Sequence, residues 1–344
     1  MKILLFSHAF YPNIGGIESI SLMLANNFNN RQDVSVIVIT RTKEKGNKQF
    51  PFRVVRGPSI GEIISLLKWC DVVFENNPCF GMSWPNLLIR RPNIVGLQTW
   101  LTAPKEKKTL QNRLKKRLLN NYNTVVACSN KIKSYTFNKA LVIGNPYDSN
   151  NFRQYEVIKN YDFVFVGRLV SDKGADMCVE LLNELYLIKG KKFSLTIIGD
   201  GPEMNNIKEL AINYNLMNEI RFLGFLPAEE IAKELNQHRY LLVPSRWEEP
   251  FGIVALEGMA CGCIPIVSDG GGLPDAVGKA GVVFKRNLIS SLVQSTVQLL
   301  DSIQQQDRLL EFATEHLSNH TAVKVSQRYF DLFLKVSSVR KSKL

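Results

Sequence analysis

Two acidic residues stand eight positions apart in a stretch of the chain that is otherwise apolar. They are Glu249 and Glu257, and Glu257 is the only charged residue between positions 252 and 267. A carboxylate buried in such a run is costly unless it is hydrogen-bonded, and the vicinal hydroxyl groups of a sugar would provide that bonding. An acid that only complements a helix dipole would account for Glu248 or Glu249, but not for a residue so deep in the run. We therefore predict that Glu257 binds ligand hydroxyl groups.

The chain between these two acids is expected to change from loop to helix. Pro250 and Gly252 mark the loop, and a helical pattern begins at Ile253. Because the first N–H groups of a helix lack intrahelical acceptors, those around Phe251, Gly252 and Ile253 favour an anion. This segment predicts an anion site beside the two carboxylates.

A second loop carries two cations between glycines. It runs Gly167-Arg168-Leu-Val-Ser-Asp-Lys173-Gly174 and follows an expected strand at 163–166. Arg168 and Lys173 place two positive charges at the end of that strand, which is an arrangement suited to a diphosphate.

Two further glycine turns follow expected strands. Gly15 and Gly16 lie between a strand and a helix, where glycine lets the backbone approach a ligand closely, although a plain tight turn would look the same. Gly199 opens the sequence Gly-Asp-Gly-Pro. Pro202 interrupts that turn and Met204 stands where a third glycine belongs, so we reject a nicotinamide-binding fingerprint there.

Alternating strand-like and helix-length segments must position these loops. Continuous runs of Val, Ile and Leu between helical stretches indicate buried parallel strands in βαβ units. The expected strands are 3–6, 34–40, 72–74, 94–97, 125–127 and 141–143 in the first half, and 163–166, 195–198, 220–223, 240–243, 264–267 and 282–284 in the second. Two such sets predict two facing, doubly wound α/β domains. Ligands of such sheets bind at the carboxyl ends of the strands, which here would face a cleft between the domains.

The domain boundary is expected where both periodicities break, in the Asn-rich segment from 145 to 160. We predict an N-terminal Rossmann-like domain at 1–155 and a C-terminal Rossmann-like domain at 156–322. A C-terminal helix at 323–344 is expected to pack back on the N-terminal domain.

The basic excess of the chain lies in its first half. The net charge is +12, with 22 Lys and Arg against 8 Asp and Glu at 1–155, and 21 against 23 in the remainder. Seven of the basic residues fall between Lys105 and Arg117, where leucines recur at the spacing of one helix face. A basic amphipathic helix suits an anionic membrane surface or a phosphate-bearing partner, and a solvated helix face is the alternative. Aromatic residues do not interleave with these cations, which disfavours nucleic acid.

Length and composition limit the class of protein. The 344 residues predict about two domains, and 45% hydrophobic with 22% charged residues is typical of a folded globular chain. No run approaches about 18 apolar residues, so no spanning helix is expected, and the first residues resemble a strand rather than an export signal. Six cysteines without regular spacing do not indicate a disulfide framework, which favours a reduced, cytoplasmic location. His238, His316 and His320 lack ligand spacing and are expected on helix surfaces.

The order of these motifs resembles that of the GT-B glycosyltransferases of the retaining family 4 type. The resemblance covers nearly the whole chain and is strongest from 163 to 284. It rests on the Gly15-Gly16 turn, Gly-Asn-Pro-Tyr-Asp at 144–148, Gly167-Arg168 with Lys173-Gly174, Gly199-Asp-Gly-Pro, Phe-Leu-Gly-Phe-Leu at 222–226, Pro244-Ser245, the two acids with seven residues between them, and Ser-Asp-Gly-Gly-Gly-Leu-Pro-Asp at 268–275.

The resemblance implies a retaining enzyme that moves a hexose-type sugar from a nucleoside diphosphate donor, such as a UDP- or GDP-sugar. The acceptor would be a glycan or lipid-linked molecule in cell-envelope polysaccharide, lipopolysaccharide or capsule assembly. The resemblance also implies that the domain at 1–155 is on the acceptor side and that the domain at 156–322 binds the nucleotide sugar. The implied catalytic residues are Glu249, which contacts the transferred sugar, and Arg168 and Lys173, which stabilise the departing diphosphate. Glu257 would bind the ribose. The other implied donor-binding residues are Gly15, Gly16, Gln98, Gly167, Gly199, Phe225, Leu226, Phe251, Gly252 and Ile253.

The resemblance implies no metal ion and no other cofactor. Asp-x-Asp, the metal-binding pair of transferases of the other common fold, does not occur in the sequence. Gln98 stands where many family members carry a His. Its amide can hydrogen-bond to a sugar but cannot titrate, so a proton relay at this position is not expected.

Three other functions fit parts of the sequence. They are a GT-B enzyme with a soluble acceptor, a nucleotide-sugar epimerase of similar fold, and a non-catalytic protein that binds a nucleotide sugar.

Overall fold

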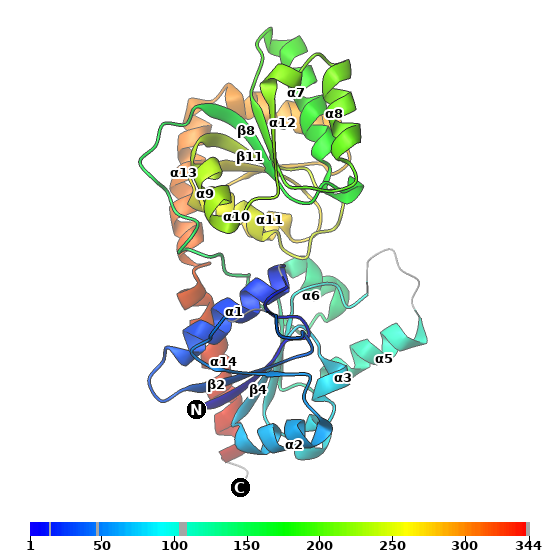
Figure 1. The fold of residues 1–344 in the computed structure, drawn as a ribbon, viewed down its shortest axis with the longest axis vertical. Helices are drawn as coiled ribbons and strands as arrows, with labels where there is room; N and C mark the ends of the chain where they lie inside the picture. The colour runs from blue at the N-terminus through cyan, green and yellow to red at the C-terminus, as the bar shows by residue number, and fades with distance from the viewer. Residues whose placement is uncertain (14, 46–47, 103–108, 342–344) are drawn as a thin grey trace. The chain divides into compact units, whose positions relative to one another are not determined.

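The computed structural model describes residues 1–344 apart from 14, 46–47, 103–108 and 342–344. The chain forms two compact units (Figure 1), one made of Met1–Pro146 with Thr321–Leu344 and the other of Tyr147–His320. We refer to them as the N-terminal and C-terminal units.

The boundaries of these units lie earlier than the predicted ones at 155 and 322. The segment after Pro146 belongs to the C-terminal unit because its polar groups are paired there. The N–H group of Tyr155 donates to Asn236 at 2.7 Å, and the N–H group of Tyr147 donates to the carbonyl of His320 at 3.1 Å.

The N-terminal unit contains a parallel seven-stranded sheet in the order β3-β2-β1-β4-β5-β6-β7. Its strands are β1 (Lys2–Phe6), β2 (Ser35–Thr40), β3 (Arg53–Arg56), β4 (Val72–Asn76), β5 (Asn93–Leu97), β6 (Thr124–Ala127) and β7 (Leu141–Val142). Its helices are α1 (Gly16–Asn29), α2 (Ile60–Trp69), α3 (Phe80–Ser83), α4 (Asn86–Ile89), α5 (Leu110–Leu118), the 3₁₀ turn η1 (Leu119–Asn121), α6 (Asn130–Thr136) and α14 (Ala322–Lys341).

Alternation along β4 assigns its side chains to the two faces of this sheet. Phe74 points to the face covered by α1 and α14, where it packs on Phe28 and Phe333 with ring centroids 6.3 and 5.6 Å apart. Val73 points to the opposite face and joins a buried cluster that includes Leu66 of α2.

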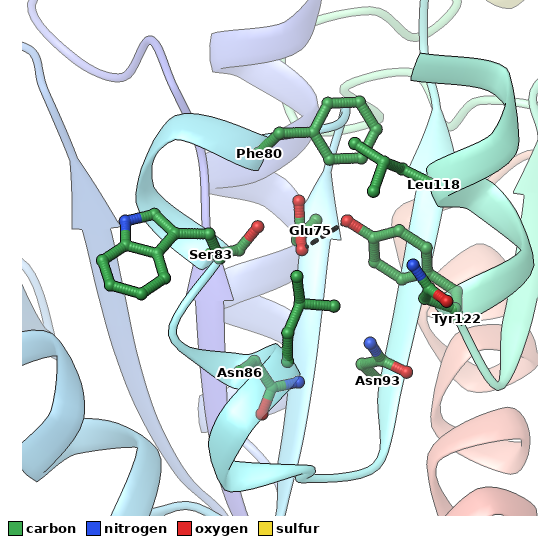
Figure 2. Close-up of a pocket in the computed structure, with 10 residues that line it drawn as sticks. Glu75, Phe80, Ser83, Asn86, Asn93, Leu118 and Tyr122 are labelled. Atoms are coloured by element: carbon green, nitrogen blue, oxygen red, sulfur yellow. Dashed lines mark hydrogen bonds between the residues drawn. The ribbon is translucent and has the colours of Figure 1, made fainter. Parts of the chain in front are cut away.

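Glu75 shares the face of Val73, so a carboxyl group occupies a core position. It is buried, and Tyr122 donates its hydroxyl to Oε1 at 2.7 Å while the N–H of Cys79 donates to Oε2 at 2.6 Å. Figure 2 shows this carboxyl group beside Tyr122 and Ser83. Burial raises the pKa of Glu75 above its ordinary value.

The C-terminal unit contains a parallel six-stranded sheet in the order β10-β9-β8-β11-β12-β13. Its strands are β8 (Tyr161–Val166), β9 (Leu195–Ile198), β10 (Ile220–Gly224), β11 (His238–Val243), β12 (Ile264–Ser268) and β13 (Val282–Phe284). Its helices are the 3₁₀ turn η2 (Ser171–Lys173), α7 (Ala175–Lys189), α8 (Met204–Asn213), the 3₁₀ turn η3 (Met217–Glu219), α9 (Ala228–Asn236), α10 (Ile253–Ala260), α11 (Leu273–Val277), α12 (Ile289–Leu300) and α13 (Ile303–Ser318).

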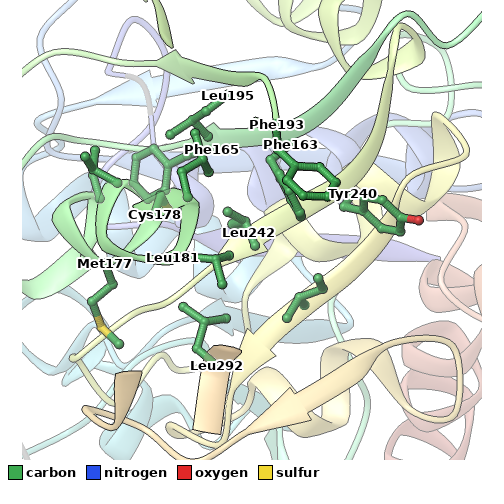
Figure 3. Close-up of a cluster of buried hydrophobic side chains, with 14 of the residues drawn as sticks. Phe163, Phe165, Met177, Cys178, Leu181, Phe193, Leu195, Tyr240, Leu242 and Leu292 are labelled. Carbon is green, nitrogen blue, oxygen red and sulfur yellow. The ribbon is translucent and has the colours of Figure 1, made fainter. Parts of the chain in front are cut away.

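The largest apolar core of the C-terminal unit joins one face of its sheet to α7 and α12. Phe163 and Leu242 from the sheet meet Leu181 of α7 and Leu292 of α12, and all four are buried. Figure 3 shows this cluster. Burial of each large apolar side chain contributes about 1.5–3 kcal/mol to folding stability. The core therefore holds in place the strands whose carboxyl ends carry the site.

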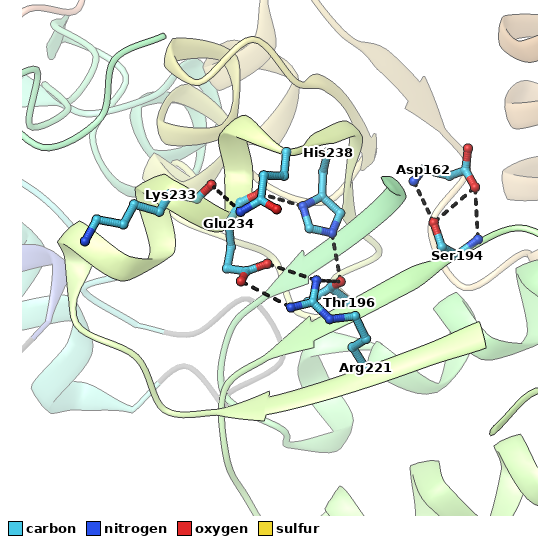
Figure 4. Close-up of polar contacts among 8 residues, drawn as sticks. Asp162, Ser194, Thr196, Arg221, Lys233, Glu234 and His238 are labelled. Carbon is cyan, nitrogen blue, oxygen red and sulfur yellow. Dashed lines mark hydrogen bonds and ion pairs between the residues drawn. The ribbon is translucent and has the colours of Figure 1, made fainter. Parts of the chain in front are cut away.

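A polar network replaces apolar contacts around His238 (Figure 4). His238 was expected on a helix surface, but it begins β11 and is fully buried. Its Nδ1 lies 2.6 Å from the carbonyl of Glu234 and its Nε2 lies 2.8 Å from Thr196 Oγ1. Burial lowers the pKa of His238 to about 4, so the ring is neutral near pH 7.

Among the residues that the structure describes, none of the helices combines the length and the hydropathy that crossing a bilayer requires.

Candidate functional site

The centre of the C-terminal sheet brings two of the predicted loops together. β8 and β11 are neighbours, and the chain proceeds from β8 toward one edge of the sheet and from β11 toward the other. Ligands of open parallel sheets bind beyond the carboxyl ends of the strands at such a switch point. The loop after β8 carries Lys173, and the loop after β11 carries Glu249.

Lys173 and Glu249 form an ion pair across these loops. Lys173 Nζ lies 2.5 Å from Glu249 Oε1, and the hydroxyl of Ser245 donates to the same oxygen at 2.8 Å. The two charged side chains are 26% and 13% exposed, so water screens the pair only in part. Glu249 Oε2 makes no hydrogen bond with a residue that the structure describes, which leaves it available to a ligand.

Backbone hydrogen bonds fasten the loop of Lys173 to the loop of Glu249. The carbonyl of Asp172 accepts from the N–H groups of Arg246 at 2.7 Å and Trp247 at 3.1 Å. Arg246 also binds Asp176 of α7 through two bonds of 2.6 and 2.7 Å. These contacts hold the backbone beside Lys173 against the residues just before Glu249.

Glu257 lies one helix turn inside α10 and is only partly exposed. Among the described residues, none donates a hydrogen bond to its carboxyl group or pairs with it. Burial, reinforced by the negative charge of Asp148, raises the pKa of Glu257 from 4.5 to about 7. The carboxyl group is therefore partly desolvated without the compensation that Glu249 receives.

The N-terminus of α10 lies between the two acids, as predicted. Gly252 is the N-cap, and no side chain caps this end, so the first N–H groups have no intrahelical acceptor. Gly252 has a φ of +106°, and a Cβ atom there would lie 2.4 Å from Leu273 Cδ2. A side chain at this position would thus clash as well as strain the backbone. Phe251 is buried and Ile253 is partly exposed.

The turns after β8, β9 and β10 are in backbone contact. The N–H of Gly199 donates to the carbonyl of Gly224 at 2.7 Å, and a Cβ at Gly199, whose φ is +137°, would lie 1.9 Å from the carbonyl oxygen of Gly167. Phe225 and Leu226 follow directly, and Phe225 is 69% exposed. These turns therefore bring Gly167, Gly199 and two further predicted donor-binding residues, Phe225 and Leu226, to one edge of the sheet.

Arg168 follows Gly167 and is exposed. Its guanidinium forms no ion pair with any residue within the described part of the chain.

The other predicted donor-binding residues belong to the N-terminal unit. Gly15 is the N-cap of α1 and Gly16 is its first residue, and a Cβ at Gly15 would lie 2.5 Å from the Glu18 carboxylate, which folds over this helix start. Gln98 follows β5 and is buried. Its side chain bonds to the hydroxyl of Tyr329, and its Oε1 is buried without a partner in the described residues.

The supporting contacts of Ser245, Arg246 and Asp176 were not predicted from the sequence. Ser245 and Arg246 lie between the end of β11 and Glu249, whereas Asp176 lies in α7. Within the described residues, no three His, Cys, Asp or Glu side chains converge as metal ligands would.

The chain was compared with known proteins. Residues 148–316 match the family described as glycosyl transferases group 1, and this segment contains Lys173, Glu249 and Glu257. Residues 148–316 therefore form a group 1 glycosyltransferase domain. An uncharacterized glycosyltransferase of Methanocaldococcus jannaschii is 27% identical over 88% of this chain and 89% of its own length. Three other curated glycosyltransferases align over only 39%, 35% and 32% of their own lengths.

Solved structures show that this glycosyltransferase has the GT-B fold. HepE of Anabaena in complex with UDP has a TM-score of 0.79 at 18% identity, covering 97% of this chain and 100% of that one. WaaG, a glycosyltransferase involved in lipopolysaccharide biosynthesis, has a TM-score of 0.66 at 15% identity, covering 96% and 99%. At these identities the likeness concerns the fold alone.

Proposed function

We propose that this glycosyltransferase takes a sugar from a nucleoside diphosphate donor, transfers it with retention of anomeric configuration, and needs no metal ion. The state of Glu257 carries the proposal. Its carboxyl group is partly removed from water and unpaired among the described residues, and burial raises its pKa to about 7. Ribose hydroxyl groups would supply the missing hydrogen bonds and favour the ionised form.

We assign Lys173 and Arg168 to the diphosphate. The ammonium of Lys173 has three N–H donors, of which one reaches Glu249, so the others remain for phosphate oxygens. With the first N–H groups of α10 and the exposed Arg168, it would stabilise the leaving group in the way that a metal ion does elsewhere. Glu249 would accept from a hydroxyl of the transferred sugar through Oε2.

We assign acceptor binding to the N-terminal unit and propose a glycan or lipid-linked acceptor of envelope polysaccharide assembly. The net charge of +14 over residues 1–155 supports an anionic acceptor or an anionic membrane surface. Residues 105–108 of the basic segment from Lys105 to Arg117 lie outside the described residues, and α5 begins at Leu110. The involvement of WaaG in lipopolysaccharide biosynthesis agrees with this class of acceptor, and the UDP in HepE makes UDP-sugars the first donors to test.

A thermal-shift screen of UDP- and GDP-sugars, followed by turnover with lipid-linked and soluble acceptors, tests the proposal. A ligand that binds only the folded protein raises its melting temperature. We expect Glu257→Gln to lose most of the donor-induced shift, and Glu209→Gln, at an exposed position on α8, to keep it. We expect the product to have the anomeric configuration of the donor and turnover to persist in excess chelator. Unchanged donor affinity and turnover in Glu257→Gln would contradict the proposal, and turnover on soluble acceptors alone would replace its acceptor class.

A further inference from the structure

A cavity of about 70 Å³ lies in the N-terminal unit, between β4, α3, α4 and the end of α5. Its walls are mostly apolar and include Phe80, Trp84, Leu87 and Leu118. Figure 2 shows Phe80 and Leu118 on one side of Glu75. Both carboxyl oxygens of Glu75 already accept hydrogen bonds within the protein, and burial raises its pKa above the ordinary value. The cavity therefore suits an apolar group.

An open groove of about 370 Å³ continues from this cavity. The residues that line both spaces are Asn86, Leu87, Asn93 and Asn121. The groove adds Arg91, whose guanidinium is bound by the carbonyls of Leu67 and Lys68, and Arg90, which is exposed. The guanidinium of Arg90 makes no hydrogen bond or ion pair with any described residue, so its charge is available to an anion.

Exposed apolar side chains lie at the cavity and on the helix that ends there. Trp84 and Leu87, which line the cavity, are 45% and 50% exposed, and Leu110 and Leu114 of α5 are 82% and 57% exposed. The last turn of α5 is basic. Exposed apolar side chains next to cations are typical of a surface that meets anionic lipid.

We propose that an anionic phospholipid of a bilayer binds here, with one hydrocarbon chain in the cavity beside Glu75 and its phosphate group near Arg90. A saccharide fits less well because several polar side chains at the cavity, including Glu75, Tyr122 and Ser83, are already paired. Asn86, for example, makes both of its side-chain hydrogen bonds with the backbone of Arg91. The site goes beyond the proposed function and uses none of the donor-binding residues, so it stands or falls independently of them.

Sedimentation with vesicles of phosphatidylglycerol and phosphatidylcholine tests both halves of the site. Arg90→Asn keeps a residue that tolerates the left-handed conformation found there (φ 58°), and we expect it to weaken binding to phosphatidylglycerol about fivefold. Leu87→Trp adds apolar surface but narrows the mouth, and we expect it to weaken binding about tenfold, because two or more methylene groups lose their burial. Leu88→Ser, outside the cavity, is the matched control and should change binding less than twofold.

The alternative is that the exposed apolar surface enters the bilayer and that no hydrocarbon chain occupies the cavity. This alternative predicts the opposite order of vesicle binding for the variants. Leu87→Trp would then bind as tightly as the wild type or tighter, and Leu88→Ser would bind more weakly; either result overturns the proposal. Equal affinity for purely phosphatidylcholine vesicles would overturn the assignment of the phosphate to Arg90. The donor-induced thermal shift of each variant shows that it is folded, so a failure of the lipid site is distinguishable from a failure of the donor site.

Quenching of tryptophan fluorescence then locates the chain. Of the four tryptophans, Trp84 lines the cavity. We expect phosphatidylglycerol with brominated acyl chains to quench the wild type and to lose most of that effect in Trp84→Phe. Quenching that is the same in both proteins would place the chain elsewhere and overturn the proposal.

Discussion

Replacing Glu257 by Gln should make the ligand-free protein more stable at pH 8 while abolishing donor binding. The rise in the pKa of Glu257 from 4.5 to about 7 means that the unfolded chain ionises this group more readily than the folded one. The contribution of Glu257 to the free energy of unfolding is therefore fully present below pH 4.5 and is lost as the pH rises toward 7. A difference of about 2.5 in pKa corresponds to a loss of about 3 kcal/mol in the free energy of unfolding once the group is ionised in both states. At pH 5 the same linkage gives a loss of about 1 kcal/mol.

Urea unfolding of both proteins at pH 5 and pH 8 measures this difference. We expect the free energy of unfolding of Glu257→Gln to exceed that of the wild type by about 1 kcal/mol at pH 5 and about 3 kcal/mol at pH 8. The cost of desolvating the glutamine amide, which is smaller than that of a carboxylate, reduces both differences. The exposed Glu209→Gln serves as the control and should show no such pH dependence. If Glu257→Gln is no more stable than the wild type at pH 8, the carboxyl group is compensated in the free protein, and the reasoning that assigns it to ligand hydroxyls fails.

Three further predictions follow from other contacts. Tyr122→Phe leaves one oxygen of buried Glu75 without a donor and should lower the free energy of unfolding by about 1–3 kcal/mol in urea; a change within about 0.5 kcal/mol would contradict this. Arg246→Asp and Asp176→Arg should each lower kcat about 10–100-fold by misplacing the loop of Lys173. The double exchange should recover much of that loss, and a double variant no better than the single ones would show that their pairing is not what matters. Burial lowers the pKa of His238 to about 4, so the unfolded chain binds a proton more readily than the folded one. The free energy of unfolding should therefore fall by about 3 kcal/mol as the pH falls from 7 to 4. His238→Gln should show a correspondingly shallower dependence of this free energy on pH.

Local sequence was sufficient to predict most of the fold. The twelve predicted strands are present because each is a continuous apolar run, and most of these runs are buried within a parallel sheet. β3 was missed because its sequence, Arg-Val-Val-Arg, has only two apolar residues, which reflects its position at the edge of the sheet. His238 was misplaced because the network that buries a polar residue comes from other elements, here Thr196 and Glu234.

The site was predictable where one segment carries its own signal. The helix start at Gly252 and the charge pattern around Glu257 are local, and the structure has α10 beginning at Ile253. The pairing of Lys173 with Glu249 joins residues 76 positions apart, and the contact of Arg246 with Asp176 spans 70. Such contacts depend on β8 and β11 being neighbours, which strand order determines and local sequence does not.

The two acids of this motif look equivalent in the sequence but lie in different electrostatic environments. Glu249 is compensated before any ligand arrives, by Lys173 and by Ser245, so its orientation is fixed in the free protein. Glu257 lacks such compensation among the described residues, and its raised pKa is a free-energy penalty that hydroxyl donors would relieve. One carboxylate is thus held in position for the reacting sugar, while the other gains most from ligand binding. This division follows from their places in the fold, since the first follows the end of β11 next to β8 and the second lies inside α10, away from any cation in the described chain.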